Sequence, residues 1–211
     1  MGGSVRRALI SVSDKTGVPE LGRALTAREW MIISTGGTKE ALAVAKVPVV
    51  KIESITGVPE MLGGRVKTIH PKIAGGILAR RDNPQDMKQL EEKLNMGAID
   101  LVVVNLYPFL QTAAKPDAGY DDLIENIDIG GPTLLRAAAK NSRDVVVLVD
   151  PLDYPRFLFE SDLPGGVRLE FRFEMMRKAF EHTAAYDAAI AQTMAEFVPV
   201  NGKLVRQPKM N

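Results

Sequence analysis

Three segments of this chain have the composition of a phosphate-binding loop. They are residues 11–17 (SVSDKTG), 34–38 (STGGT) and 128–133 (DIGGPT), and each precedes or opens a stretch whose pattern predicts a helix. The first turn of a helix has unpaired N–H groups and a partial positive charge, so three such turns facing one crevice would form a strong anion site. Arg65 and Lys67, in the separate segment GRVKTIHP, add two fixed cations. One phosphate needs fewer binding groups than these. The surplus indicates a phosphorylated substrate with further polar groups, and therefore a catalytic site.

Two of these segments also have a plainer interpretation, which the sequence leaves open. TGGT at 35–38 could be an ordinary strand-to-helix turn, in which Thr38 either caps the helix or donates its hydroxyl to phosphate. Residues 11–17 could be a solvated loop with an Asp14 or Thr16 cap, although Lys15 is a natural counter-charge for phosphate.

The RVKTIH segment and the two histidines are open in the same way. An extended RVKT would place Arg65 and Lys67 on one side, as on a plain edge strand. For His70 we favour a hydrogen-bonded loop residue over a catalyst. His182 and Tyr186, four residues apart on a predicted helix, are favoured as a polar pair that holds this helix to the body of the protein.

The segment DIGGP offers the most specific chemistry. Two glycines free consecutive N–H groups from side-chain cover beside Asp128, an arrangement that resembles an oxyanion hole next to a carboxylate. Lys140 lies about 12 Å further along a regular helix than Pro132 and could reach back only by leaning towards the N-terminus. Asn105 and Tyr107 follow the strongest predicted strand and suit recognition of a heterocycle, although Tyr107 could equally cover the core.

Composition limits the class of protein. The 211 residues are enough for one α/β domain, and 27 Lys and Arg against 26 Asp and Glu give a net charge of +1, which does not favour nucleic acid or anionic membrane as a partner. The absence of cysteine excludes disulfides and thiolate metal sites, and the two histidines have no spacing that suggests a metal centre. No signal-peptide core and no apolar run of about 20 residues is found. We therefore expect a soluble, cytoplasmic protein.

Alternating strands and helices must position these groups. Buried strands are predicted at 7–12, 30–35, 47–52, 74–79, 101–105 and 144–149, and helices at 18–29, 37–45, 85–94, 121–126, 133–140 and, in two pieces, 167–197. This order predicts an α/β fold with a parallel sheet covered by helices on both faces. Ligands of such sheets bind beyond the carboxyl ends of the strands, where residues 13–17, 35–38 and 105–109 lie.

Taken together, the segments resemble one family closely, the IMP cyclohydrolase domain of the bifunctional purine biosynthesis protein. The resemblance spans residues 7–194 and rests on the stretches SVSDKTG, STGGT, TGVPEML-GGRVKTIHPKIAGGILARRDNP, IDLVVVNLYPF, ENIDIGGPTLLRAAAKN and FEHTAAYDAAIA. It implies a methylglyoxal-synthase-like three-layer fold over residues 1–197. Residues 198–211 would then be a linker to a transformylase domain that this chain lacks, so no transformylase activity is expected.

The implied reaction is closure of 5-formamidoimidazole-4-carboxamide ribonucleotide to IMP with loss of water, the last step of purine synthesis. The resemblance implies Lys67, Tyr107, Asp128 and Lys140 as catalytic residues, with Lys140 the family's proton donor or acceptor. The implied substrate-binding residues are Ser13, Asp14, Lys15, Thr35, Gly36, Gly37, Thr38, Arg65, Val66, Thr68, Val104, Asn105, Ile129 and Gly130. No metal and no organic cofactor is required, and a homodimer is expected.

In this reaction the carboxamide nitrogen attacks the formyl carbon of the same molecule, so the enzyme mainly fixes a reactive rotamer. Lys67 and the amides of Ile129 and Gly130 are candidates to stabilise the charge on the formyl oxygen. The division of acid and base among Asp128, Tyr107 and Lys140 stays open.

Two other functions use the same fold. A ligand-sensing module of the kind found in carbamoyl phosphate synthetase would need the anion site without the four catalytic groups. Methylglyoxal synthase would need an Asp and His set in different motifs, which this sequence does not show.

Overall fold

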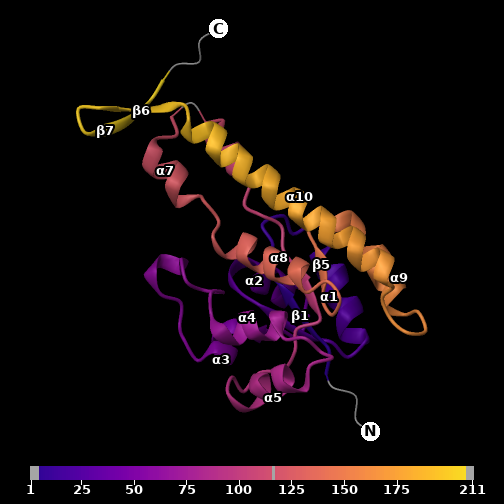
Figure 1. Cartoon of the computed structure of the whole chain (residues 1–211). Helices are drawn as coiled ribbons and strands as arrows, with labels where there is room; N and C mark the ends of the chain where they lie inside the picture. The colour runs from indigo at the N-terminus through magenta and orange to yellow at the C-terminus, as the bar shows by residue number, and fades with distance from the viewer. Residues whose placement is uncertain (1–4, 116, 208–211) are drawn as a thin grey trace.

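A five-stranded parallel sheet forms the centre of the computed structural model, which describes residues 5–115 and 117–207 (Figure 1). The strand order is β3-β2-β1-β4-β5. The strands are β1 (Arg7–Ile10), β2 (Met31–Ser34), β3 (Val50–Lys51), β4 (Leu101–Val103) and β5 (Val146–Leu148). β1, β4 and β5 are almost entirely buried, as their continuous apolar runs require of parallel strands between two layers of helices. The predicted α/β class is confirmed.

Helices and short helical turns connect and cover the strands. They are α1 (Val18–Ala27), α2 (Gly36–Val44), α3 (Ile52–Thr56), η1 (Leu62–Gly64), α4 (Pro71–Leu78), α5 (Pro84–Glu92), α6 (Phe109–Ala113), α7 (Tyr120–Glu125), α8 (Gly130–Lys140), η2 (Pro151–Asp153), α9 (Tyr154–Ser161) and α10 (Leu169–Met194). α1 packs with α2 and α9, whereas α8 packs with α4 and α10. The chain moves from β1 outwards in both directions, so right-handed crossovers place these two groups on opposite faces. Within the described ranges, no helix is both long and apolar enough to cross a membrane.

The strand predicted at 74–79 is wrong, because residues 74–78 belong to helix α4 and Ala79 is its C-cap. Pro71 occupies the first turn, and Nδ1 of His70 accepts a hydrogen bond from the Lys72 N–H at 3.1 Å, which starts a helix. The buried residues Ile73, Gly76 and Ile77 follow helical spacing. A methyl group at Gly76 would lie 3.1 Å from the Ile99 side chain, so the glycine permits close packing. The preferred interpretation of His70, as a hydrogen-bonded loop residue, is confirmed.

The C-terminal helix is one continuous element, not two pieces as predicted. α10 contains neither proline nor glycine between Leu169 and Met194, so nothing in its sequence breaks it. It lies along α8 and extends past the sheet towards an antiparallel hairpin, β6 (Phe197–Val200) and β7 (Lys203–Arg206) (Figure 1). Asn201 and Gly202 both have positive φ, as a two-residue hairpin turn requires. Part of the predicted linker is thus a hairpin, and its role as a linker stays a prediction.

Candidate functional site

Two ammonium groups lie at the N-terminus of helix α2. A methyl group placed on Gly37 would lie 3.7 Å from Nζ of Lys15, and one on Gly36 would lie 3.8 Å from Nζ of Lys67. Gly36 has a φ of +52°, which favours glycine over other residues. The unpaired N–H groups of the first helical turn face the same region, so this end of α2 combines partial and full positive charges. The arrangement is suited to a phosphate.

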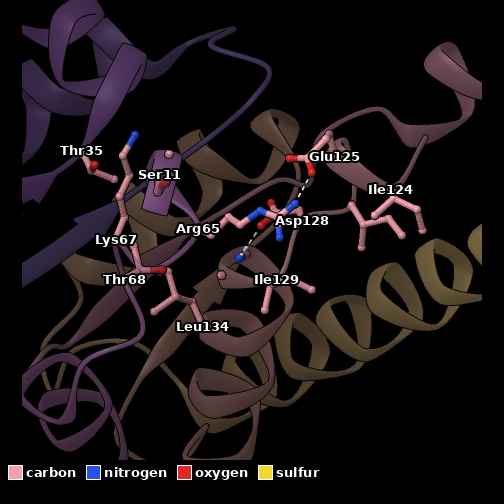
Figure 2. Close-up of a pocket in the computed structure, with 14 residues that line it drawn as sticks. Ser11, Thr35, Arg65, Lys67, Thr68, Ile124, Glu125, Asp128, Ile129 and Leu134 are labelled. Carbon is pink, nitrogen blue, oxygen red and sulfur yellow. Dashed lines mark hydrogen bonds and ion pairs between the residues drawn. The ribbon is translucent and has the colours of Figure 1, made fainter. Parts of the chain in front are cut away.

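A cavity of about 460 Å³ opens beside this helix end (Figure 2). Its lining brings together the loops after β1 and β2, the loop before α4, helix α7 and the start of α8. The lining residues are Ser11, Thr35, Gly63, Arg65, Lys67, Thr68, Ile124, Glu125, Ile127, Asp128, Ile129, Gly130, Gly131 and Leu134. Seven of these, Thr35, Arg65, Lys67, Thr68, Asp128, Ile129 and Gly130, were predicted site residues.

The N-terminus of α8 forms the second polar wall of the cavity. Oδ1 of Asp128 accepts a hydrogen bond from the Gly131 N–H at 2.8 Å. The N–H groups of Ile129 and Gly130 make no hydrogen bond with any described residue and remain available to a ligand. A methyl group on Gly130 would lie 2.5 Å from Oγ1 of Thr68, so this helix start and the RVKT segment approach each other too closely for a side chain. A carboxylate beside two free N–H groups is the arrangement expected from the sequence.

The side chains of two residues predicted to bind substrate, Asn105 and Thr38, make hydrogen bonds that position the loop of residues 11–17. Oδ1 of Asn105 accepts hydrogen bonds from the N–H groups of Ser13 and Asp14 at 2.7 and 2.9 Å, and Nδ2 of Asn105 donates to the Asp14 carbonyl at 3.0 Å. The Thr38 hydroxyl is buried and bridges the N–H and carbonyl groups of Val12 at 3.0 Å each. The side chains of Asn105 and Thr38 are therefore used to hold the loop that carries Lys15.

Each cation of the RVKT segment has a carboxylate partner. Nζ of Lys67 lies 2.7 Å from Oε1 of Glu60. Arg65 is paired with Glu125, as Figure 2 shows. The segment is not extended as an edge strand would be: residues 65–68 form turns and bends directly after η1, and Arg65 has helical φ and ψ. The Thr35 hydroxyl, buried in the cavity wall, has no hydrogen-bond partner among the described residues. A ligand anion could therefore replace the carboxylate partners of Arg65 and Lys67, and it could accept a hydrogen bond from the Thr35 hydroxyl.

Sequence reasoning missed Glu60 and Glu125. Neither belongs to a glycine-rich turn, and their partners Lys67 and Arg65 are found only once the chain is folded. The one signal in the sequence is proximity to a motif: Glu60 lies five residues before the RVKT segment, and Glu125 lies three residues before Asp128 of the DIGGP segment.

Several predicted residues lie outside this cavity. Lys140 is the exposed last residue of α8, about 15 Å along the helix axis from Gly130. Tyr107, in the loop after β4, is 49% exposed. Val104, the first residue after β4, is buried and could offer a ligand only its backbone groups. Val66 lies at the surface of the RVKT segment. The catalytic roles of Lys140 and Tyr107 stay predictions.

A second cavity, of about 730 Å³, includes the Ser13–Asn105 contact in its lining. Ser13, Asp14 and Asn105 line it together with Asp150 and residues of α10. The pKa of Asp14 is lowered, chiefly by hydrogen bonds from the hydroxyl and N–H of Thr16. Among the described residues, no group of three or more His, Cys, Asp or Glu side chains could hold a metal ion.

Comparison with known proteins agrees with the motifs. The model of the MGS-like domain matches residues 17–133, and that of the AICARFT/IMPCHase bienzyme matches residues 138–210. The bifunctional purine biosynthesis protein PurH of Ruminiclostridium cellulolyticum is 52% identical over 192 residues, which are 91% of this chain and 37% of that protein. PurH of Halalkalibacterium halodurans is 53% identical over 193 residues, 92% of this chain and 38% of that protein. This chain therefore spans less than two fifths of the length of these relatives.

A solved structure of similar size also matches. The crystal structure of ForH is 38% identical, with a TM-score of 0.79, over 90% of this chain and 99% of that one. The resemblance indicated by the sequence motifs, and the fold it implied, are confirmed by these matches.

Proposed function

Because the chain belongs to the family of MGS-like domains, we propose that its 460 Å³ cavity binds a phosphorylated imidazole ribonucleotide and closes its second ring. The reaction is cyclisation of 5-formamidoimidazole-4-carboxamide ribonucleotide to IMP with loss of water. One observation carries the proposal: Lys67, whose ammonium group lies at the start of α2 near that of Lys15, lines one cavity together with the carboxylate and free N–H groups at the start of α8. The similarity to PurH proteins and to the AICARFT/IMPCHase bienzyme supports it.

The substrate phosphate belongs at the start of α2. There the helix N–H groups, Lys15 and the Thr35 hydroxyl can bind its oxygens, which would give Thr35 the partner that it lacks. The imidazole ring and its two substituents then extend towards Thr68 and the start of α8. Arg65 and Lys67 exchange their carboxylate partners for substrate oxygens in this arrangement.

Ring closure forms a bond between the carboxamide nitrogen and the formyl carbon. The formyl oxygen gains negative charge, takes up two protons in successive steps and leaves as water. The carboxamide nitrogen gives up one proton as it attacks, and the formamido nitrogen gives up the other as its double bond to the formyl carbon forms. We assign the stabilisation of that oxygen to the N–H groups of Ile129 and Gly130 and to Lys67, and their presence in the lining of one cavity supports this assignment. Asp128, in the same wall, is the group best placed to take the amide proton. Tyr107 and Lys140 are the further candidates for proton transfer, and no metal or organic cofactor takes part.

The test is spectrophotometric conversion of the formylated ribonucleotide to IMP by this 211-residue chain, without folate. We expect cyclisation, no folate-dependent formyl transfer, and far tighter binding of IMP than of inosine because so many groups are directed at the phosphate. Purified protein that binds IMP but does not cyclise would favour the ligand-sensing module. Equal affinity for inosine and IMP would refute the phosphate site.

We propose in addition that the protein acts in the cytoplasm as a homodimer and that a transformylase domain can accompany it, as the bifunctional relatives suggest. Two-fold oligomers are the commonest assemblies of soluble enzymes. Analytical ultracentrifugation that finds a strict monomer at high concentration would refute the dimer.

A further inference from the structure

Helix α10 contacts both loops that carry candidate acid-base residues. Nε2 of His182 accepts a hydrogen bond from the Leu106 N–H at 3.3 Å, next to Tyr107 in the loop after β4. One turn later, Oη of Tyr186 accepts one from the Asp128 N–H at 2.8 Å, at the start of α8. The preferred interpretation of this pair, two polar side chains that hold the helix to the body, is confirmed.

We propose that His182 and Tyr186 are positioning residues that set where Tyr107 and Asp128 stand relative to the substrate. This inference rests on the proposed cyclisation and extends it to a helix that does not line the 460 Å³ cavity, although His182 lines the second cavity. Its basis is the target of each bond, which is a backbone N–H of a candidate catalytic residue or of its immediate neighbour.

Tyr186 connects the two loops by a single side chain. Its ring packs edge-on against Phe109, with ring centroids 6.2 Å apart, and Phe109 opens helix α6 just after Tyr107. Its hydroxyl oxygen accepts the hydrogen bond from the Asp128 N–H, and the hydroxyl donates one to the Asn126 carbonyl at 3.5 Å. Tyr186 is only 9% exposed, so water cannot readily replace these contacts.

The fold itself has other means of holding α10. Phe171, Met175 and Ala179 are buried in the core on the N-terminal half of the helix. The polar contacts come further along, where the helix crosses the loops of the site. Loss of the Tyr186 hydroxyl should therefore leave the fold in place but release the Asp128 backbone.

A shift of Asp128 would disturb both parts of the α8 wall, because its carboxylate also binds the Gly131 N–H. Misplacement of a reacting group by about 1 Å can lower a rate by about 100-fold. The start of α2 and Lys15 are held separately, by Thr38 and Asn105, and should keep their grip on the phosphate. We therefore expect Tyr186→Phe to lower kcat about tenfold or more and to leave KM within about threefold.

The chain contains a matched control for the loss of a buried phenol. Tyr154 is 4% exposed, and its hydroxyl has no hydrogen-bond partner among the described residues. Tyr154→Phe removes the same atom from a comparably buried side chain. The Tyr154 ring lies beside Gly17, at the end of the 11–17 loop, but does not line the 460 Å³ cavity, so the change should leave kcat unchanged. At the other contact, His182→Leu removes the acceptor, whereas His182→Gln retains one and should recover most of the activity.

The experiment measures steady-state kinetics, thermal stability and amide hydrogen exchange for these variants. Support requires that Tyr186→Phe lowers kcat with KM nearly unchanged, and that its Asp128 amide loses protection from hydrogen exchange. The control Tyr154→Phe should keep both the wild-type kcat and the protection of the Asp128 amide. The inference is overturned if kcat of Tyr186→Phe stays close to that of Tyr154→Phe, or if KM and kcat deteriorate together. Should Tyr186→Phe fail to fold, His182→Leu against His182→Gln decides by kcat and by the protection of the Leu106 amide. KM is not a criterion for these variants, because Leu106 directly follows Asn105, which holds the loop of Lys15.

Failure of the proposed function would look different. Wild-type protein without cyclisation would refute that function, and the exchange data would then decide the positioning role alone. The positioning role would be refuted if the Asp128 and Leu106 amides exchange at the same rate in the variants as in the wild type.

Discussion

Lys15 and Lys67 lie at the same helix end, and their replacement by Met should separate binding from chemistry. Lys15 is exposed, donates to the Ser13 carbonyl at 3.2 Å and lies against Gly37. A hydrogen bond to a charged group contributes about 1.5–3 kcal/mol, and about 1.4 kcal/mol is a factor of ten. Lys15→Met should therefore raise KM and weaken IMP binding by about 10- to 100-fold, with kcat retained.

Lys67→Met should act on both quantities. Its Nζ lies beside Gly36, at the phosphate end, but the residue also lines the cavity next to the α8 wall. Loss of an oxyanion donor costs about 2.7–4 kcal/mol, so kcat should fall by about 100- to 1,000-fold. KM should rise as well, because the Glu60 carboxylate, 2.7 Å from Lys67 in the native protein, would then face the substrate phosphate unpaired.

Glu60→Gln in the Lys67→Met background distinguishes these two effects. It should restore part of KM by removing the repulsion and leave kcat low. The measurements are steady-state cyclisation kinetics and calorimetric binding of IMP. If Lys67→Met raises KM alone with kcat intact, Lys67 is a phosphate ligand, and the oxyanion role passes to the Ile129 and Gly130 amides.

Three further predictions concern the α8 wall, the Arg65 ion pair and pH. Gly131→Ala should lower kcat about tenfold or more in kinetic assays, because its methyl group would lie 2.5 Å from Oδ2 of Asp128; unchanged kcat would contradict this. Glu125→Gln should tighten IMP binding by at most about fivefold in calorimetry, since an exposed ion pair contributes about 0–1 kcal/mol; weaker binding would show that Glu125 contacts the ligand. Burial lowers the pKa of His182 from 6.5, so its contribution to stability is complete above pH 6.5 and is lost as pH falls below it; His182→Gln should flatten that part of a pH series of thermal melts.

The sequence alone determined the sheet and the loops of the site. Continuous β-branched runs such as 101–104 are stable only when both faces are buried, and parallel strands bring their carboxyl ends to one edge. The apolar run at 74–79 is too short to show a clear period, so its composition predicts a strand, and only the proline and cap before it favour the helix that forms.

Tertiary structure alone decided which side chains line the candidate site and which hold the loops that carry them. Asn105 meets Ser13 and Asp14 across more than 90 residues of sequence, and this contact commits its amide to the loop. Lys67 meets Glu60 only because the chain turns through η1. Local sequence fixes where a backbone N–H group or a charge stands in an element. Its partner depends on how distant elements pack, and no local pattern encodes that.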